Sequence, residues 1–415
     1  MHTFTKLTFL EWIRHSPLPP YHENTQVVII IPALAEEHIV ETIDSLTQNA
    51  DPECHVECLI MINESESALE SVRRVNEISF EKAQNALVNN ELTWIDFHIV
   101  YCYEIPHKDY GVGFVRKLLM DEAARRFHGS NTGMIASLDG DCRVSRNYCT
   151  ELAKLQHARL KKELFVIHFE HRIDESTYPD IICDYEIHLR YFINMQAWLR
   201  LPYAFQTIGS SFCVRSDSYL QIGGMNKRKA GEDFYFIHKF SKKGTCDRLA
   251  RCTVFPSGRI SDRVPFGTGK AVGDASRRSA KILTYNPASF RQLSVFIGQL
   301  KEIWSEPMVQ TLIEKCPMLV REYFGNEKHI TSIERLKQNT RSYETFEKAF
   351  FQWFDAFKLM KFLHFARTYF EDIPVMEAVE ETVEELGIKF TNESRFEVLD
   401  ALRHQDKEVV NARQV

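Results

Sequence analysis

Apolar runs alternate with polar, helix-like stretches along the first third of the chain. Residues 26–31 read Gln-Val-Val-Ile-Ile-Ile, and the run stops at Pro32. Such an unbroken run is typical of a strand that is buried on both faces of a parallel sheet. The pattern predicts further strands at residues 56–62, 95–102 and 134–138, with helices between them at residues 36–48, 66–88 and 113–127. Strands and helices in alternation predict an α/β domain with a mostly parallel central sheet.

The alternation loosens beyond Asp139, and strand signals nearly vanish after about residue 271. In the middle of the chain the pattern predicts strands at residues 164–168 and 207–214 and helices at residues 181–199 and 232–242. Helical periodicity then covers residues 290–304, 308–324, 343–370 and 375–386. We therefore expect an N-terminal extension at residues 1–25, an α/β domain at residues 26–270 and a helical C-terminal region at residues 271–415.

A broad aromatic stripe marks one of the predicted C-terminal helices. Its members recur at helical spacing and are Phe346, Phe350, Trp353, Phe357 and Met360. The stripe fits a helix face that packs on the α/β domain. Lysines nearby leave a second interpretation open, a contact with a membrane surface or with a second copy of the chain in a homodimer.

The overall composition indicates which kinds of binding partner and which cellular location to expect. The chain has 415 residues and a formal net charge of −6, which gives no general attraction to nucleic acid. Its 10 cysteines include no Cys-x-x-Cys pair and predict reduced, buried thiols. No apolar stretch approaches the ~18 residues of a membrane-spanning helix, and the N-terminus lacks the apolar core of a signal peptide. We expect a cytoplasmic protein, or one peripheral to the inner face of a membrane.

The first candidate for chemistry is the segment Asp139-Gly140-Asp141, which follows the predicted strand at residues 134–138. In open α/β sheets, ligands gather at the carboxyl ends of the strands. Two carboxylates held there repel each other unless a cation lies between them. Mg²⁺ or Mn²⁺ fits, because such ions take oxygen ligands and are shared with substrate phosphates. A solvated turn without a ligand is the alternative.

The second candidate is the acidic pair Glu232 and Asp233, which follows Gly231 and opens the predicted helix at residues 232–242. Acidic residues in the first turn often only complement the helix dipole. This pair, however, comes directly after the basic, glycine-rich segment at residues 223–230. A carboxylate on a rigid helix end is well suited to act as the general base for an acceptor hydroxyl.

Four stretches, taken in order, resemble a family 2 glycosyltransferase with the GT-A nucleotide-sugar-binding fold. They are Ile31-Pro-Ala-Leu-Ala-Glu-Glu37, Leu138-Asp-Gly-Asp141, Ile208-Gly-Ser-Ser-Phe-Cys-Val-Arg215 with Ile222-Gly-Gly-Met225, and Gly231-Glu-Asp233. The resemblance covers about residues 26–265. It implies that residues 26–270 form a GT-A catalytic domain. Such a domain moves a sugar from a UDP- or GDP-sugar to a hydroxyl of a glycan or lipid-linked acceptor, in the synthesis of a surface polysaccharide or another glycan.

The resemblance also implies roles for individual residues. Asp139 would contact the donor ribose and share a divalent metal with Asp141, which would ligate it directly. Asp233 would take the acceptor proton, with Glu232 beside it, in a reaction that inverts the anomeric carbon. The further donor contacts that the resemblance implies are Pro32, Glu36, Asn63, Arg116, Lys117 and Arg263. Arg263 belongs to the basic segment at residues 259–270, which fits either a lid over the donor phosphates or an ordinary surface loop.

Two positions depart from the family pattern. Ala35 stands where the family often has asparagine, and Asn63 follows the second strand where the family usually has the aspartate that reads the nucleobase. The base of the nucleotide and the third metal ligand therefore stay open.

Two other functions stay open as well. A phosphohydrolase of the haloacid dehalogenase type also carries Asp-x-Asp after a strand, with Asp139 as its nucleophile. That motif normally follows the first strand of its domain, whereas here it follows the fourth predicted strand. A non-catalytic relative would bind a nucleotide sugar or a glycan without transferring it. Against this reading, the sequence retains all three predicted carboxylates, Asp139, Asp141 and Asp233.

Overall fold

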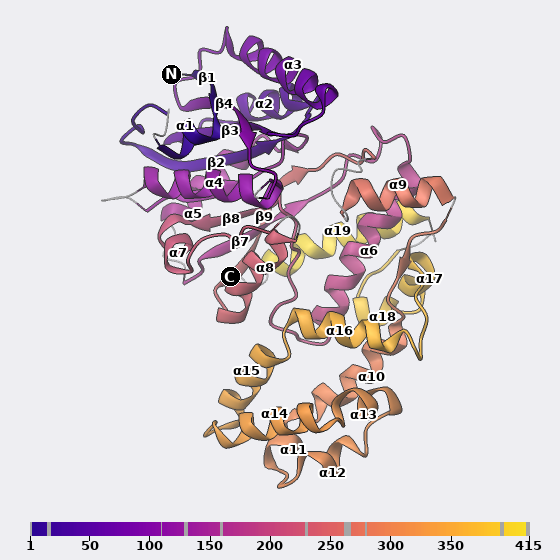
Figure 1. Ribbon diagram of the computed structural model, residues 1–415. Coiled ribbons are helices and arrows are strands. Elements are labelled where there is room, and N and C mark those ends of the chain that lie inside the picture. The colour runs from indigo at the N-terminus through magenta and orange to yellow at the C-terminus, as the bar shows by residue number, and fades with distance from the viewer. Residues whose placement is uncertain are drawn as a thin grey trace. The chain divides into compact units, whose positions relative to one another are not determined.

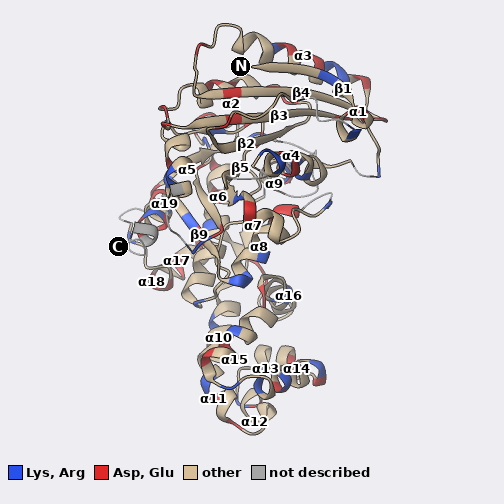
Figure 2. Ribbon diagram, turned by 90° about the vertical axis from the view of Figure 1, so that its left-hand side faces the viewer, with Lys and Arg blue, Asp and Glu red and all other residues tan. Residues whose placement is uncertain are grey.

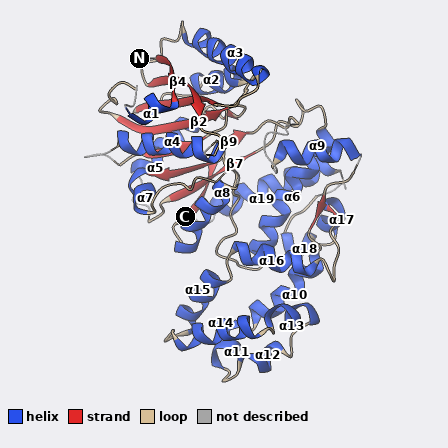
Figure 3. Cartoon of the chain, in the orientation of Figure 1, coloured by secondary structure: helices blue, strands red, loops and turns tan. Residues whose placement is uncertain are grey.

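The computed structural model describes residues 2–14, 18–108, 110–127, 132–157, 161–228, 231–260, 267–278, 280–390 and 394–411. The chain divides into two compact units. The first, here called the sheet unit, comprises Met1–Thr177, Thr207–Lys270 and Asp406–Val415. The second, the helical unit, comprises Tyr178–Gln206 and Ala271–Gln405. Figure 3 shows that the long strands belong to the sheet unit.

The sheet unit contains a nine-stranded sheet of order β1-β4-β3-β2-β5-β8-β7-β9-β6. Its strands are β1 (Thr3–Thr8), β2 (Thr25–Ala33), β3 (His55–Ser65), β4 (Ile95–Ile105), β5 (Met134–Ser137), β6 (Arg143–Val144), β7 (Leu164–Phe169), β8 (Phe212–Arg215) and β9 (Cys246–Phe255). Five of the eight strand pairs are parallel, including all four from β1 to β5. The predicted fold class, α/β with a mostly parallel sheet and a helical C-terminal region, is confirmed.

Helices cover both faces of this sheet (Figure 1). Those of the sheet unit are α1 (Phe9–Arg14), α2 (Ile39–Thr47), α3 (Glu70–Leu87), α4 (Val112–Arg126), α5 (Tyr148–His157), α7 (Ser216–Gln221) and α8 (Glu232–Lys243). α2 and α3 pack against each other, and α4 packs on β2, β3 and β5. α1 lies beside α4, since the rings of Phe9 and Phe114 meet edge to face at 5.7 Å.

Burial explains why the central strands carry unbroken apolar runs. Residues 27–31 of β2 are fully buried, and every residue of β3 is buried, because helices cover both faces. The ribbon of these central strands is almost free of charged residues, whereas α3 carries both signs along its length (Figure 2). An apolar strand in this position contributes to the core on each face.

The helical unit is built from short helices. Its elements are α6 (Pro179–Trp198), β10 (Leu283–Thr284), α10 (Pro287–Gly298), α11 (Leu300–Ser305), α12 (Val309–Ile313), α13 (Met318–Phe324), α14 (Glu327–Gln338), α15 (Tyr343–Trp353), α16 (Ala356–Ala366), β11 (Ile373–Pro374), α17 (Val375–Glu380) and α18 (Val383–Leu386). Two further helices span the residue boundaries of the two units, α9 (Thr268–Arg278) and α19 (Arg395–Asn411).

The predicted aromatic stripe supplies core residues of the helical unit itself. Phe346 and Phe350 are fully buried, and Phe350 lies 6.0 Å from Phe296, whose ring stacks on Phe324 at 4.1 Å. Phe357 is 40% exposed and lies under the ammonium group of Lys361. The apolar face is therefore used largely within this unit.

The structure differs from the sequence-based ranges in several places. β1 is an edge strand paired in parallel with β4, so residues 1–25 contribute to the sheet rather than only preceding it. Residues 178–206, placed by the sequence in the α/β domain, belong to the helical unit because α6 packs with α17 and α18. The predicted helix at residues 343–370 is divided at Asp355, whose carboxylate accepts from the Lys358 N–H at 3.0 Å and begins α16.

Each of the ten cysteines is a free thiol. Within the part of the chain that the structure describes, no helix is both long and apolar enough to cross a membrane.

Candidate active site

Two neighbouring strands of the sheet unit, β2 and β5, are not consecutive in the chain. The chain leaves β2 for β3 and β4 and returns to β5 on the other side of β2. In open α/β sheets, ligands bind at such a switch point, outside the carboxyl ends of the strands. Glu36 follows β2 and Asp139 follows β5, so two of the predicted donor residues lie at the switch point.

The loop that carries Glu36 is held by side chains from two other elements. Ala35 adopts a left-handed conformation (φ 45°), which is uncommon for residues other than glycine and which asparagine tolerates better than alanine. Its backbone N–H donates to Asn76 Oδ1 at 2.8 Å, and Ser79 Oγ donates to the carbonyl of Glu36 at 2.8 Å. The amide group of Asn63 donates to the carbonyl of Ala33 at 2.6 Å. This network fixes Glu36, which is only 4% exposed.

The turn that carries the first acidic pair packs tightly against this loop. A Cβ atom at Gly140 would lie 3.0 Å from Glu36 Cγ and 3.3 Å from Ala33 Cβ. Thr42 Oγ1 donates to the carbonyl of Gly140 at 2.8 Å and anchors the turn to α2. The close approach favours glycine, because a larger residue would push against the Glu36 and Ala33 side chains, and Asp139 and Asp141 lie on either side of this glycine.

A buried arginine joins the first acidic pair to the second. Arg116 on α4 is 2% exposed; its Nη2 donates to Asp139 Oδ1 at 2.6 Å and its Nη1 pairs with Glu232. Its Nε donates to Ser137 Oγ at 3.0 Å, so all three nitrogens are used. The end of β5 and the start of α8, which are distant in the sequence, thus meet on one guanidinium group.

The charges of this cluster are tightly coupled. Desolvation acts to lower the pKa of Arg116, but the carboxylates of Asp139, Glu232 and Asp233 outweigh it and raise the pKa. Arg116 is therefore a fixed positive charge. Desolvation together with the neighbouring Asp141 raises the pKa of Asp139, against the lowering effect of Arg116. A second cation beside Asp139 and Asp141 would relieve this repulsion.

Asp233 lies next to this cluster, and the pKa of its carboxyl group is raised. Burial and the adjacent Glu232 raise its pKa to about 7, while Arg116 and the backbone N–H of Phe234 act against the rise. Phe234 donates to Asp233 Oδ1 at 2.7 Å, which orients the carboxylate at the start of α8. A carboxylate whose pKa lies near neutrality is suited to accept a proton during a reaction.

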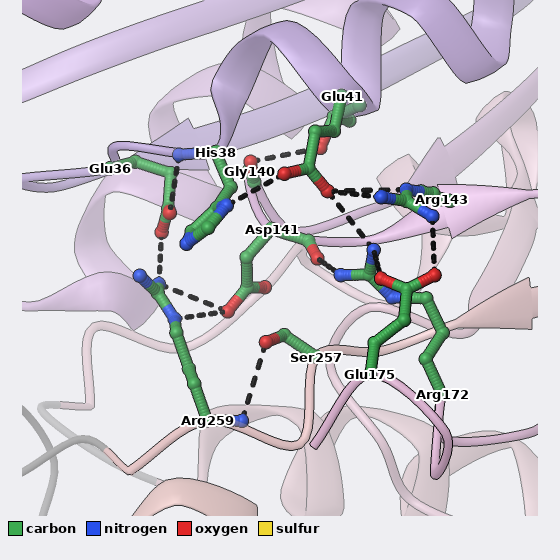
Figure 4. Close-up of polar contacts among 11 residues, drawn as sticks. Glu36, His38, Glu41, Gly140, Asp141, Arg143, Arg172, Glu175, Ser257 and Arg259 are labelled. Carbon is green, nitrogen blue, oxygen red and sulfur yellow. Dashed lines mark hydrogen bonds and ion pairs between the residues drawn. The ribbon is translucent and has the colours of Figure 1, made fainter. Parts of the chain in front are cut away.

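A second arginine links the two acidic loops at the switch point (Figure 4). Arg259 pairs with Glu36, and its Nη2 lies 3.0 Å from Asp141 Oδ2. This arginine approaches from the segment after β9 and is 25% exposed. The guanidinium of Arg259 thus lies between the carboxylates of Glu36 and Asp141, whose negative charges favour a cation at this position.

Further charged side chains surround the turn that carries Asp141 (Figure 4). Arg172 donates to the carbonyl of Asp141 at 3.2 Å and to Glu41 at 3.0 Å, and Arg143 donates to Glu41 at 2.7 Å. Desolvation opposes ionisation of Glu41, but hydrogen bonds from His38, Arg172 and Arg143 lower its pKa to about 2. Glu41 thus stays charged and holds both arginines against the turn.

The other predicted site residues lie in different surroundings. Lys117 pairs with Asp121 at 2.7 Å along α4, and Pro32 is a buried residue of β2 beside Met61 of β3. Asn63 uses its amide group within the loop network described above. Their contacts with a donor stay predictions. Arg263 lies outside the described residues.

The sequence did not single out Arg259, Arg172 or Ser137 as individual site residues. Residues 259–270 are rich in basic side chains, which indicates a contact with the donor phosphates. The residue predicted to make that contact is Arg263, not Arg259. Arg172 and Ser137 gave no signal, because their partners are defined only by the folded chain.

The donor set at the switch point fits a hard divalent cation. Its atoms are carboxylate oxygens, and the Arg259 guanidinium already marks a cation position between Glu36 and Asp141. Among the described residues, no group of three or more His, Cys, Asp or Glu side chains forms a complete metal site. Binding of such an ion by Asp139 and Asp141 stays a prediction, and substrate phosphates and water would have to complete its coordination, as is common for Mg²⁺.

Comparisons with solved structures find chains of similar fold. The chain is similar to the crystal structure of S. aureus TarS 1–349 in complex with UDP-GlcNAc, with a TM-score of 0.40, 13% identity, and coverage of 79% of this chain and 89% of that one. It is also similar to the mannosyltransferase PcManGT from Pyrobaculum calidifontis in complex with GDP-Man and Mn²⁺, with a TM-score of 0.36, 11% identity, and coverage of 86% and 91%. No family model and no curated protein matches the sequence. At these values the similarity carries no weight for the chemistry, which depends on the residues above.

Proposed function

We propose that this chain is a metal-dependent glycosyltransferase that moves a sugar from a nucleotide-sugar donor to an acceptor hydroxyl. The observation that carries the proposal is the convergence of both acidic motifs on Arg116. One motif lies at the switch point where nucleotides bind in α/β sheets. The other contains Asp233, whose raised pKa suits a base. A transferase needs these two functions side by side.

On the donor side, Asp139 and Asp141 would hold a Mg²⁺ or Mn²⁺ ion, which would supply positive charge for binding the donor diphosphate. When bound, the ion neutralises charge on the diphosphate leaving group. Arg259 forms ion pairs with Asp141 and Glu36 and is placed to exchange them for donor phosphate oxygens. Arg116 holds the carboxylates of Asp139 and Glu232 in place through its two ion pairs.

On the acceptor side, Asp233 accepts the proton of the attacking hydroxyl. The hydroxyl oxygen forms a bond to the anomeric carbon as the bond from that carbon to the phosphate oxygen breaks, and its electron pair leaves with the nucleoside diphosphate. No second nucleophile is needed, so the configuration of the anomeric carbon inverts. The proton of the acceptor hydroxyl ends on Asp233.

The first test is a donor screen. Thermal shift with Mn²⁺ and a panel of UDP- and GDP-sugars is expected to identify a donor that stabilises the chain. Slow hydrolysis of that donor is expected to fall about 10²-fold in the Asp141→Ala variant, because leaving-group stabilisation is lost. Asp174→Ala, which removes an exposed aspartate, serves as the control and should match the wild type.

The same assays separate the alternatives. Phosphate release from simple monoesters would favour a phosphohydrolase with Asp139 as nucleophile. Donor binding without hydrolysis or transfer on any acceptor would favour a non-catalytic binding protein.

The second test is the pH dependence of transfer. Because Asp233 must be ionised to accept a proton and its pKa is about 7, kcat/KM should rise with pH and level off above neutrality. Below pH 7 the rate should fall about tenfold per pH unit, as the protonated fraction grows. Initial rates measured from pH 5 to 9 would show this. A profile that is flat across neutrality would contradict the assignment of Asp233.

A further inference from the structure

Two exposed cations, Lys227 and Arg228, stand directly before α8 in the segment that leads to Asp233. Within the described part of the chain, neither forms an ion pair with a carboxylate. Each instead lies on an aromatic ring. Lys227 Nζ is 5.3 Å from the centre of the Phe114 ring, and the Arg228 guanidinium carbon is 3.7 Å from the centre of the Tyr235 ring.

Two cations of the neighbouring helices α4 and α8 pair with carboxylates. Lys117 on α4 pairs with Asp121 at 2.7 Å, and Lys243 at the end of α8 pairs with Glu163 at 2.8 Å. Lys227 and Arg228 differ from them because their contacts are with ring faces, which hold a cation in place without cancelling its charge. The pair therefore presents two positive charges that meet no carboxylate among the described residues, on a chain whose formal net charge is −6.

The segment that carries these charges lies beside the start of α8. A Cβ atom at Gly113 would overlap the carbonyl oxygen of Arg228 and lie 2.9 Å from Glu232 Cγ. The backbone of Arg228 and the side chain of Glu232 thus meet on the same point of α4. Tyr235, whose ring lies under the Arg228 guanidinium, belongs to the first turn of α8, as Asp233 does.

Stacking on Tyr235 engages the face of the Arg228 guanidinium and not its N–H edge. That edge is the part of the group that binds tetrahedral oxyanions in a bidentate manner, and a lysine adds a point charge beside it. Such a pair matches the chemistry of a phosphate group rather than that of a neutral sugar.

We propose that the acceptor carries phosphate, and that Lys227 and Arg228 bind this phosphate so that a neighbouring hydroxyl faces Asp233. The inference rests on the proposed transferase function and adds the chemical class of the acceptor. The phosphate belongs either to a soluble phosphate-bearing chain or to a lipid headgroup, and binding assays can distinguish the two.

The test measures binding of the full-length chain to labelled inorganic polyphosphate, and to vesicles of phosphatidylcholine with or without phosphatidylglycerol. Three proteins are compared at low salt: the wild type, Lys227→Gln with Arg228→Gln, and Lys301→Gln with Lys328→Gln. The last pair changes the net charge equally at exposed positions of the helical unit. We expect the first double variant to weaken binding by about tenfold or more and the control double variant by less than about twofold.

The outcomes are distinct. Selective loss with polyphosphate identifies a soluble phosphate-bearing acceptor, and selective loss with phosphatidylglycerol vesicles identifies a lipid headgroup. Equal binding by the Lys227/Arg228 variant and the wild type, equal loss in both double variants, or no binding in either arm would overturn the inference. The assay needs neither donor nor turnover, so a failed donor screen would contradict the proposed function without changing this result.

Discussion

Replacement of Asp233 by asparagine is expected to slow glycosyl transfer by about 10³-fold while leaving donor binding close to that of the wild type. Asparagine keeps the size and a hydrogen-bond acceptor for the Phe234 N–H but cannot take a proton. General-base catalysis contributes about 10²- to 10⁴-fold to enzymatic rates. The donor-side groups, Asp139, Asp141 and Arg259, are unchanged by the substitution.

The measurement is single-turnover transfer to an acceptor, together with the thermal shift produced by the donor and Mn²⁺. Asp174→Asn is the matched control, because it makes the same chemical change at an exposed position. The inflection near pH 7 should also disappear from the residual activity of the Asp233→Asn variant. A variant that retains more than about a tenth of the wild-type rate would show that another group accepts the proton.

The central sheet was predictable because its strands are buried on both faces. β2, β3 and β4 lie in the interior of the sheet, so nearly every side chain of β2 and β3 is apolar or enclosed, and the runs are visible without any knowledge of the fold. The acidic pair after β5 was also predictable, because Asp139 and Asp141 directly follow such an apolar run.

The strands that the sequence did not predict have weaker signals for physical reasons. β1 pairs only with β4 at an edge of the sheet, and its two apolar residues, Phe4 and Leu7, are three positions apart, so they do not alternate with polar residues. β9 carries Asp247, Arg248 and Arg251 and has a register shift opposite Ile167, which breaks the alternation. Both strands are defined by their partners more than by their own residues.

The residues of the site also divide into those that the sequence predicts and those that only the folded chain brings together. Sequence reasoning reached Asp139, Asp141, Glu232 and Asp233 because each lies at the end of a predicted element. It could not find that Arg259 binds Glu36 and Asp141, since these three residues come from segments that only the folded sheet brings together. Arg116 was predicted as a donor contact, but its observed role is to bind carboxylates of both acidic motifs.

That role predicts a large loss of stability in the sheet unit when Arg116 is replaced. Arg116→Met keeps the length and apolar stem of the side chain but leaves Asp139 and the buried Glu232 without a counter-charge. Removing one partner of a buried ion pair typically destabilises a protein by about 3–5 kcal/mol. We expect a loss of about 3 kcal/mol or more in the free energy of unfolding at pH 8.

The pH dependence of this loss provides the sharper test. In the variant, the pKa values of the unpaired carboxyls should lie above their unfolded values, so the penalty should be full at high pH and shrink as the pH falls through those raised values. Urea unfolding at pH 8 and pH 5, with hydrogen exchange of β2 and β5 to localise the effect to the sheet unit, would measure it. Lys117→Met, one residue away on the same helix, removes a partly exposed pair and should change the stability by less than about 1 kcal/mol. Equal losses in the two variants, or a loss that grows toward pH 5, would contradict the assignment of Arg116 as the counter-charge of this site.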